Sequence, residues 1–596
     1  MSPASPSRTR IYQLMVRHFG NANDTNLVNG SIEENGCGKF DDINDAALSQ
    51  LAATGYSHIW LTGVLEQASA TSYPHRPADD PAILKGRAGS PYAIRDYFDL
   101  CPDYANDPAE RFSEFAQLIA RIHRHGMKVL IDFVPNHVAR SYASDVQPDH
   151  SFGVGDQTAT FFHRDNHFFY LQPDAAGPPL KLPVDGEVYP PEAEIGKVTG
   201  NNAVSWQPSI TDWYETVKLN YGHDFTTGRD TSHLPASHAQ LDEVPKTWRT
   251  MDRILGWWQE NGVDGFRCDM AHMVPIEFWA WAIQRARQRV DGCYFAAEAY
   301  DGDPAKLTDD NVLEALLTAG FNTIYDGDTY KTVKAIYDGG GWANDIDRHT
   351  HNDSSVFQNS LRYAENHDEV RIAADGEWGS AGASVGQPAS ALLFALSRGP
   401  IMIYNGQEVG EAGLQPNGFG GGNQRTSIFD YGSLPELSKW TNQQKYDGGQ
   451  LQENQLELAS WYRQLVLASA HPAFAHGDFY GLNHANLSNP NYARHDGETT
   501  SGHWLYSCLR RDPASGKTIL VVVHFHPVWP TGEVIIQMPQ HALEWIALDR
   551  SASWQFTDIL DGKKSITTPA SQLATKGLNI GPLQACDALY LEITAS

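Results

Sequence analysis

The stretch Asp107-Pro-Ala-Glu110, followed by Lys128-Val-Leu-Ile-Asp-Phe133, decides the fold of this chain. In the first segment the aspartate is a helix N-cap residue, the proline fits the first helical position, and the glutamate completes a capping box. Apolar residues then recur at helical spacing until Gly126, where the helix is expected to end. The second segment is a buried strand, and His58-Ile-Trp-Leu61 is a similar strand before the helix. This order predicts a parallel sheet covered by helices.

The alternation of strands and helices continues along most of the chain. Six further segments are predicted as strands: 11–16, 263–267, 294–297, 322–325, 361–364 and 401–404. A helix is expected over 250–260, before the strand at 263–267. With the two strands above, the series has the eight members that a (β/α)8 TIM barrel requires. We therefore predict an α/β fold whose catalytic barrel is built from residues 1–138 and 223–477.

Two regions depart from the barrel pattern. Residues 139–222 form a Pro-, Gly- and His-rich stretch that is too long for an ordinary loop, so we predict a subdomain, subdomain B, inserted after the third strand. From residue 478 the pattern changes to strands separated by turns, as at 504–509, 518–525, 533–538 and 588–593. This pattern predicts a C-terminal antiparallel β-sandwich domain over 478–596.

Composition narrows the class of partner. The formal net charge of the 596 residues is −28, which argues against nucleic acid or an anionic membrane as a partner because both are polyanions. A neutral sugar polymer is compatible with that charge. No segment has the pattern of a signal peptide or a membrane span, so a cytoplasmic location is expected. The six cysteines lack metal-type spacing, and free buried thiols are expected. The oligomeric state is left open.

Acidic residues follow several of the predicted strands. Asp269 ends one strand, and Arg267 lies two residues earlier on the same side of it. Glu298 ends the next strand, and Asp368 follows the seventh. The segment 132–137 follows the third. Barrels carry their catalytic groups at the C-terminal ends of the strands, so these segments are expected to meet at one mouth.

At these motifs the sequence resembles the α-amylase family of glycoside hydrolases. The family patterns DxxxNH, GFRxD, a short strand ending in Glu, and NHD are matched by Asp132…Asn136-His137, Gly265…Asp269, Ala297-Glu298 and Asn366-His367-Asp368. The segments 399–408 and 217–220 look like the family's eighth-strand segment and a diverged form of its short motif near the end of the insert. The resemblance covers most of the chain before the C-terminal domain, and it implies the barrel fold and action on α-glucans.

The resemblance also implies the roles of the three acids. Asp269 would be the nucleophile, Glu298 the acid and then the base, and Asp368 the transition-state stabiliser that grips sugar hydroxyls. Cleavage of an acetal needs a proton on the leaving oxygen and stabilisation of an oxocarbenium-like transition state. Two carboxyl groups about 5–5.5 Å apart permit a covalent glycosyl-enzyme and retention of configuration.

Five further residues are expected to bind the substrate. Arg267 would keep the nucleophile ionised and oriented, because a nearby positive charge lowers a carboxyl pKa. His137 and His367 would donate hydrogen bonds to the sugar. Tyr92 matches the aromatic residue that the family stacks against the sugar at the cleavage point. His272 would face the sugars on the leaving-group side.

The chain departs from the family pattern at two places, and at a third position it matches a possible metal ligand. His272 and Met273 stand where many members have Lys-His, which predicts weaker, less directional binding of the leaving-group sugars. Ser90-Pro91 replaces the usual His-Gly before the stacking tyrosine. Asn136 matches a position that often binds a structural calcium ion, and the insert carries acidic residues that offer further oxygen ligands. The chemistry itself needs no cofactor, and the metal content is left unknown.

Three functions stay open at this point. The first is retaining hydrolysis of α-glucosidic bonds, above all α-1,4 bonds, in starch, glycogen or maltooligosaccharides. The second is an α-glucan transglycosylase or glucosyl isomerase on the same barrel, with a sugar hydroxyl in place of water. The third is an inactive barrel that only binds carbohydrate. The presence of all three acids and Arg267 disfavours the third.

Overall fold

The computed structural model describes residues 8–172, 179–184, 186–413, 418–419, 424–549, 551–562 and 564–596. Eight parallel strands form its central sheet, in the order β11-β10-β9-β8-β5-β2-β1-β12. A parallel bridge from Arg362 to Ile401 joins the two ends of this order and closes the barrel. The strands are β1 (Arg10–Met15), β2 (His58–Thr62), β5 (Lys128–Phe133), β8 (Gly265–Cys268), β9 (Tyr294–Ala297), β10 (Thr323–Tyr325), β11 (Ser360–Leu361) and β12 (Ile401–Tyr404).

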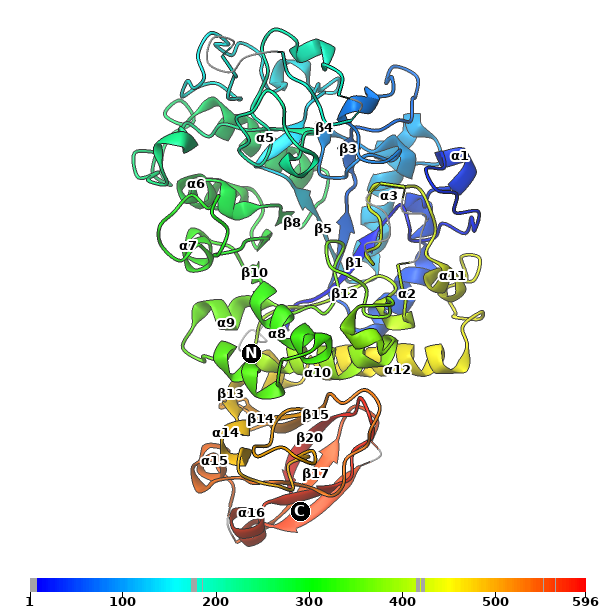
Figure 1. Cartoon of the computed structure of the whole chain (residues 1–596), viewed down its shortest axis with the longest axis vertical. Helices are drawn as coiled ribbons and strands as arrows, with labels where there is room; N and C mark the ends of the chain where they lie inside the picture. Colours follow the sequence, from blue (N-terminus) through cyan, green and yellow to red (C-terminus); the bar gives the residue numbers. More distant parts are fainter. Residues whose placement is uncertain are drawn as a thin grey trace.

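Helices surround the sheet (Figure 1). The longer ones are α2 (Asp45–Thr54), α3 (Arg111–Arg124), α5 (Lys246–Glu260), α6 (Ile276–Arg289), α7 (Val312–Ala319), α8 (Gly327–Asp338), α10 (Gly386–Leu396) and α12 (Glu453–Ala468). Shorter ones are α1 (Ile32–Asn35), α9 (Ser355–Asn359), α11 (Pro435–Thr441) and α13 (Pro472–Ala475). Apolar residues of β2, β5, β8 and β9 are buried on both faces of the sheet, so the strands read as continuous apolar runs. The predicted barrel is confirmed.

The start of α3 differs from the predicted capping box. Asp107 does cap the turn by accepting from the backbone of Ala109, but that turn is a short 3-10 helix, Pro108–Glu110. Glu114, one turn later, accepts from the backbone N–H groups of Asn106 and Asp107, at 2.8 Å each. Glu114 therefore takes the capping role that was predicted for Glu110, four positions earlier. The reason is that residues 108–110 form a 3-10 turn, which is wound more tightly than an α-helix.

Two antiparallel pairs lie beside the barrel mouth. β3 (Leu65–Gln67) pairs with β4 (Ile94–Leu100), and β6 (His137–Ala139) pairs with β7 (Thr216–Lys218). The chain between β6 and β7 is an insert with its own small core, which includes Phe169, Leu171, Leu180, Leu182, Trp206 and Tyr214. In Figure 1 this insert lies at the opposite end of the molecule from the C-terminal domain.

The C-terminal domain contains two antiparallel sheets around a separate apolar core. The larger sheet has the order β13-β14-β15-β20-β17-β18, and β16 pairs with β19. The strands are β13 (Asp478–Gly481), β14 (Leu505–Arg511), β15 (Thr518–His524), β16 (Val534–Ile536), β17 (Ser553–Asp558), β18 (Ser565–Pro569), β19 (Leu578–Gly581) and β20 (Ala588–Ala595). Its short helices are α14 (Asn483–Asn486), α15 (Gln540–Trp545) and α16 (Ala570–Lys576). The expected antiparallel β domain is present.

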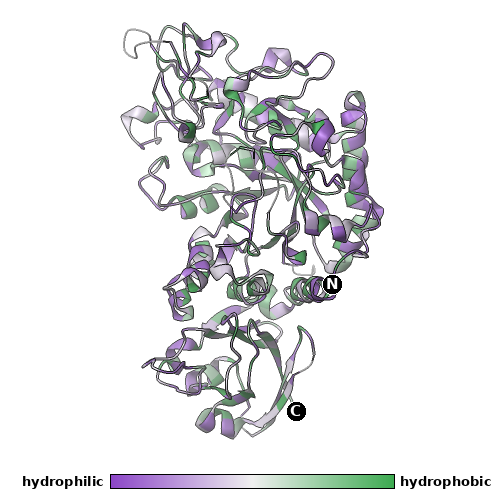
Figure 2. Cartoon of the chain, turned by 45° about the vertical axis from the view of Figure 1, so that its right-hand side comes forward, coloured by the Kyte–Doolittle hydropathy of each residue, from purple (hydrophilic) through white to green (hydrophobic). Residues whose placement is uncertain are grey.

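The C-terminal domain packs on the barrel through α10. The Tyr590 hydroxyl donates to the Ala391 carbonyl at 2.5 Å, and Arg510 donates to the carbonyl of Leu396, also at 2.5 Å. Hydrophobic segments line the interior of both parts, whereas the outer faces of the helices are polar (Figure 2). Within the described ranges no helix is long and apolar enough to cross a bilayer.

Candidate active site

The three predicted catalytic acids meet at one pocket at the C-terminal ends of the barrel strands. Asp269 directly follows β8, Glu298 directly follows β9, and Asp368 lies in the loop after β11. The pocket has a volume of about 200 Å³. It is lined by Lys85, Ser90, Tyr92, His137, Trp213, Glu215, Thr216, Asp269, Met270, Glu298, Asp368, Ile428 and Phe429. Strand ends from different parts of the chain thus supply one set of carboxylates, as in other barrel enzymes.

Arg267 holds two of the acids together. Its Nη1 lies 2.7 Å from Asp269 Oδ1, and its Nη2 lies 2.9 Å from Glu298 Oε2. The side chain is 1% exposed and lies beneath the rings of Trp60, Tyr92 and Tyr325, at 5.3–5.4 Å from their centroids. One buried guanidinium therefore sets the positions of both reacting carboxylates, and the aromatic cage fixes the guanidinium.

Asp132 connects this cage to the sugar-stacking tyrosine. Its Oδ2 accepts from Trp60 Nε1 at 3.2 Å and from the Gly63 backbone at 2.8 Å. Its Oδ1 accepts from the Tyr92 hydroxyl at 3.3 Å and lies 3.6 Å from Arg267 Nη1. The carboxylate that opens the DxxxNH motif is thus a positioning group below the pocket, while the Tyr92 ring forms part of the pocket wall.

Asp269 shares its environment with a second carboxyl group. Burial and the negative charge of Glu298 raise the pKa of Asp269 well above its ordinary value, against the opposing effect of Arg267. Two adjacent carboxyls in a dry site resist ionising together. Glu298 accepts hydrogen bonds from the Met270 backbone N–H, 2.9 Å from Oε2, and from the Tyr300 hydroxyl, 3.2 Å from Oε1. One ionised and one protonated carboxyl is the state that retaining cleavage needs.

Asp368 is ionised by its neighbours. Burial acts to raise its pKa, but His367 and the more distant Arg267 outweigh that effect and lower the pKa to about 2. Gln13 Nε2 donates to His367 Nδ1 at 2.9 Å, which leaves His367 Nε2 to face Asp368 Oδ2 at 3.0 Å. His367 is 2% exposed and does not line the pocket. It orients Asp368 rather than binding the sugar itself.

His137 does line the pocket. Its Nε2 lies 3.8 Å from Asp269 Oδ2, and its ring packs against Trp213, with centroids 5.3 Å apart. Burial, with Lys218 and Lys85 nearby, lowers the pKa of His137 to about 3. A neutral imidazole at this place offers a hydrogen bond to a sugar without a charge that would compete for the nucleophile.

The structure changes the expected role of His272. Its side chain is 0% exposed, and its Nε2 lies 3.1 Å from Asp303 Oδ2 in the loop after β9. Met273 is 2% exposed. Neither residue lines the pocket, so the predicted direct contact with leaving-group sugars is wrong for this structure. The short 3-10 turn Ala271–Met273 directs both side chains inward, and His272 acts on that side of the site only through the β9 loop.

The expected calcium position at Asn136 does not fit a cation. Lys218 Nζ donates to Asn136 Oδ1 at 2.6 Å, and Asn136 Nδ2 donates to the Gly200 carbonyl at 2.6 Å. Lys218 is 3% exposed, and burial lowers its pKa to about 7. The oxygen that would bind calcium is therefore satisfied by an ammonium group that would repel the ion. Among the acidic residues of the insert, Asp156 accepts from the Tyr170 hydroxyl at 3.0 Å.

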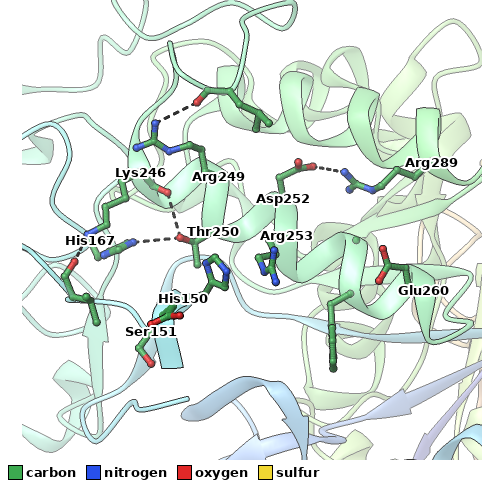
Figure 3. A pocket seen from close by; sticks show the side chains of 15 residues that line it. His150, Ser151, His167, Lys246, Arg249, Thr250, Asp252, Arg253, Glu260 and Arg289 are labelled. Carbon is green, nitrogen blue, oxygen red and sulfur yellow. Dashed lines mark hydrogen bonds and ion pairs between the residues drawn. The ribbon is translucent and has the colours of Figure 1, made fainter. Parts of the chain in front are cut away.

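A second pocket, of about 620 Å³, lies between the insert and α5, away from the three acids (Figure 3). Two of its arginines are paired: Arg289 Nη1 lies 2.6 Å from Asp252 Oδ1, and Arg249 donates to the Leu241 carbonyl. His167 faces the Thr250 hydroxyl at 3.4 Å. This lining offers no acid–base pair for the reaction, and the small pocket is the candidate active site.

Sequence reasoning missed seven residues of the pocket wall: Lys85, Trp213, Glu215, Thr216, Met270, Ile428 and Phe429. They come from loops and the insert, where no periodic pattern indicates position. Two lining residues also have left-handed backbone conformations, Trp213 with φ 51° and Met270 with φ 43°. Such strain in non-glycine residues persists where the surroundings impose it, and it is frequent at functional sites.

Comparisons with known proteins agree with this geometry. The family model for the α-amylase catalytic domain matches residues 13–457. The α-amylase MalA of Haloarcula japonica is 26% identical over 419 residues, which are 69% of this chain and 46% of that protein. Cyclomaltodextrin glucanotransferase of a Bacillus species is 29% identical over 284 residues, 45% of this chain and 31% of that protein. The chain thus spans less than half the length of these curated relatives.

Solved structures show the same fold. The maltogenic α-amylase AmyB of Thermotoga neapolitana superposes with a TM-score of 0.57 at 18% identity, over 98% of each chain. Trehalose-6-phosphate hydrolase of Bacillus licheniformis gives 0.58 at 13% identity, over 99% of each chain. The family model matches most of the length of this chain, and the three acids of the family motifs lie at one barrel mouth. The chain belongs to the α-amylase family of glycoside hydrolases.

Proposed function

We propose that the protein is a retaining glycoside hydrolase that cleaves α-glucosidic bonds, above all α-1,4 bonds, in starch, glycogen or maltooligosaccharides. The observation that carries the proposal is the single guanidinium of Arg267 that holds Asp269 and Glu298 side by side in a pocket that Asp368 completes. A nucleophile on one face of the anomeric carbon and an acid on the side of the leaving oxygen, with a further carboxylate for the hydroxyls, is the arrangement that retention requires.

The reaction proceeds in two displacements. Asp269 attacks the anomeric carbon while the bond to the leaving sugar breaks, and the leaving oxygen takes the proton of Glu298. The ionised Glu298 then takes a proton from water, and the resulting hydroxide attacks the same carbon and releases Asp269. The Asp368 carboxylate binds hydroxyl groups of the distorted ring, and the Tyr92 face packs against its apolar side. The two steps together return both acids to their starting protonation.

The same intermediate also supports transfer. If a sugar hydroxyl rather than water meets the glycosyl-enzyme, the product is a longer or rearranged glucan, as the name of the matched glucanotransferase indicates for that protein. Hydrolysis is the proposal for this chain, and transfer is the alternative that the experiment separates. The cytoplasmic location stays a prediction from the sequence.

Incubation with maltoheptaose tests the proposal. We expect shorter maltooligosaccharides by chromatography and, by NMR at early times, a first product in the α-anomeric form. Longer products would favour transfer, and a β-anomeric first product would contradict retention. An unchanged substrate with a folded protein would remove the hydrolase assignment.

A further inference from the structure

Glu215, a residue of the wall of the catalytic pocket, has a buried carboxylate oxygen without a hydrogen-bond partner in the described part of the chain. Glu215 stands directly before β7 and is 4% exposed. Its Oε1 pairs with Lys85 Nζ at 2.6 Å. Its Oε2 is buried and accepts no hydrogen bond from the residues that the structure describes. An unsatisfied buried acceptor is costly, and native structures retain such groups mainly where a ligand supplies the donor.

Lys85 places this pair close to the reacting groups. The ammonium of Lys85 is one of the charges that lower the pKa of His137, whose Nε2 lies 3.8 Å from the Asp269 carboxylate. The Lys85 ammonium also lies over the Phe429 ring, 5.9 Å from its centroid. Lys85, Glu215 and Phe429 all line the pocket that holds the three acids. The pair therefore belongs to the wall around the reacting sugar.

The barrel order shows which side of the sugar this wall faces. Glu298 follows β9 and protonates the leaving oxygen, so the leaving group lies on its side of the mouth. Lys85 lies in the segment between β2 and β5, and Phe429 follows β12. Going round the barrel, β2, β1 and β12 are the strands farthest from β9. The wall with Lys85 thus faces the glycon, the part of the substrate that stays on the enzyme.

Three separate segments close this wall. The Tyr214 hydroxyl of the insert donates to the Leu84 carbonyl at 2.7 Å. The Ala88 N–H donates to the Phe429 carbonyl at 3.1 Å. Between these bonds, a Cβ on Gly86 would lie 2.2 Å from the Phe429 oxygen, so only glycine permits the close approach. The Lys85–Glu215 ion pair completes the joint between the insert and the barrel loops.

The pocket is small for an endo-acting cleft. Its volume of about 200 Å³ lies below the roughly 300–1,000 Å³ of sites that hold drug-sized ligands. A space of this volume, bounded by the three acids and the wall with Lys85, holds about one sugar ring. A glucan that continued past that ring would have to pass through the wall formed by Lys85, Glu215 and Phe429.

We propose that Lys85 and Glu215 form the end wall of the glycon site, bind hydroxyls of a terminal glucosyl unit, and make the enzyme act on non-reducing chain ends. Glu215 Oε2 accepts from a sugar hydroxyl, and the Lys85 ammonium donates to a hydroxyl oxygen. A polar site built to pair with substrate hydroxyls strongly rejects an analogue that lacks them. This inference rests on the proposed α-glucosidic activity.

The wild-type enzyme gives the first test. Two maltoheptaosides with a labelled reducing end are compared, one free and one with its non-reducing-end hydroxyls capped as a cyclic acetal. We expect the free substrate to shorten one glucose at a time and the capped one to react at least about 100-fold more slowly. Cleavage of both at similar rates overturns the inference but leaves the hydrolase proposal intact. Failure on both and on maltose overturns the hydrolase proposal, and the inference with it.

Variants give the second test. Glu215→Gln and Lys85→Gln should lower kcat/KM on the free substrate about 10- to 100-fold and reduce the discrimination against the capped one. Because a single change leaves one buried charge unpaired, the double variant Lys85→Gln/Glu215→Gln keeps the test valid if either single variant unfolds. The exposed residues Glu187 and Lys181 of the insert supply the controls Glu187→Gln and Lys181→Gln, which should match the wild type. Full discrimination in the folded double variant would overturn the assignment.

Discussion

At the scale of single residues, the site depends on one cation shared by two acids. Arg267 contacts Asp269 and Glu298 at 2.7 and 2.9 Å, and both acids are almost fully buried. Burial and the negative charge of Glu298 raise the pKa of Asp269, and Arg267 opposes that effect. The residues that resemble family ligands therefore divide into two groups. Tyr92 and His137 line the pocket, whereas Arg267, His367 and His272 act through the carboxylates that they hold.

Replacement of either reacting acid should abolish turnover without unfolding the protein. Asp269→Asn removes the nucleophile, and Glu298→Gln removes the proton donor. We expect kcat to fall by at least about 10²–10⁴-fold in each, since acid–base catalysis alone contributes that much. Kinetics on maltoheptaose and thermal unfolding of the same samples measure the two effects. Glu260→Gln, on the exposed face of α5, is the control. Retention of more than a tenth of wild-type activity by either variant would refute the catalytic assignment.

At the scale of elements, β7 brings a lysine to the position where calcium was expected. Antiparallel pairing with β6 sets Lys218 opposite His137, and so brings its ammonium to Asn136. Glu215 directly precedes the same short strand. β7 therefore positions both the Lys218 contact with Asn136 and the Glu215 side chain in the pocket wall. We propose that this contact takes the place of a structural calcium ion.

Lys218→Met tests the proposed substitution. Loss of the ammonium leaves Asn136 Oδ1 buried without a donor, so the free energy of unfolding should fall by about 1–3 kcal/mol. The melting temperature of the wild type should not respond to millimolar calcium or to EDTA, because a ligand stabilises only the state that binds it. Differential scanning calorimetry measures both effects, with the exposed Lys181→Met as the control. A calcium-dependent melting temperature of the wild type would contradict the proposal.

At the scale of the whole molecule, buried neutral histidines set the stability at low pH. Burial lowers the pKa of His58, on β2, to about 4. The unfolded chain has an ordinary histidine pKa of about 6.5, so between these values it binds a proton that the folded protein does not. This stability is present above pH about 6.5 and is lost as the pH falls toward 4.

His58→Gln should therefore flatten the pH dependence of stability. The wild type is expected to lose up to about 3 kcal/mol between pH 6.5 and 4 from this one group. The variant lacks that loss, although its stability at pH 7 is lower because a packed ring is removed. Urea unfolding at a series of pH values measures both slopes. His238→Gln, at an exposed site, should keep the wild-type slope. Parallel slopes for wild type and His58→Gln would show that His58 does not carry the effect.

The sequence by itself determined the strands and the acids at their ends. The segments 128–133, 294–297 and 401–404 have the predicted bounds because an apolar run between turn residues is a local signal. Asp269 and Glu298 follow such runs directly, so their common location needed only the rule that parallel strands end at one face. The strand predicted at 361–364 was displaced, since two residues, Ser360–Leu361, are too few for a clear pattern.

Only the tertiary structure decided what surrounds those acids. Lys85 meets Glu215 across 130 residues, and Asn136 meets Lys218 across 82, by contacts that no periodicity encodes. His272 was expected to face the sugar, yet a single 3-10 turn directs it inward to Asp303. Local sequence determines which backbone conformations are low in energy, but the direction of a loop side chain depends on the packing of distant segments. The proposed chemistry could therefore be predicted from the residues at the strand ends. The shape of the pocket depends on loops that only the folded barrel brings together. The proposed preference for chain ends follows from that shape.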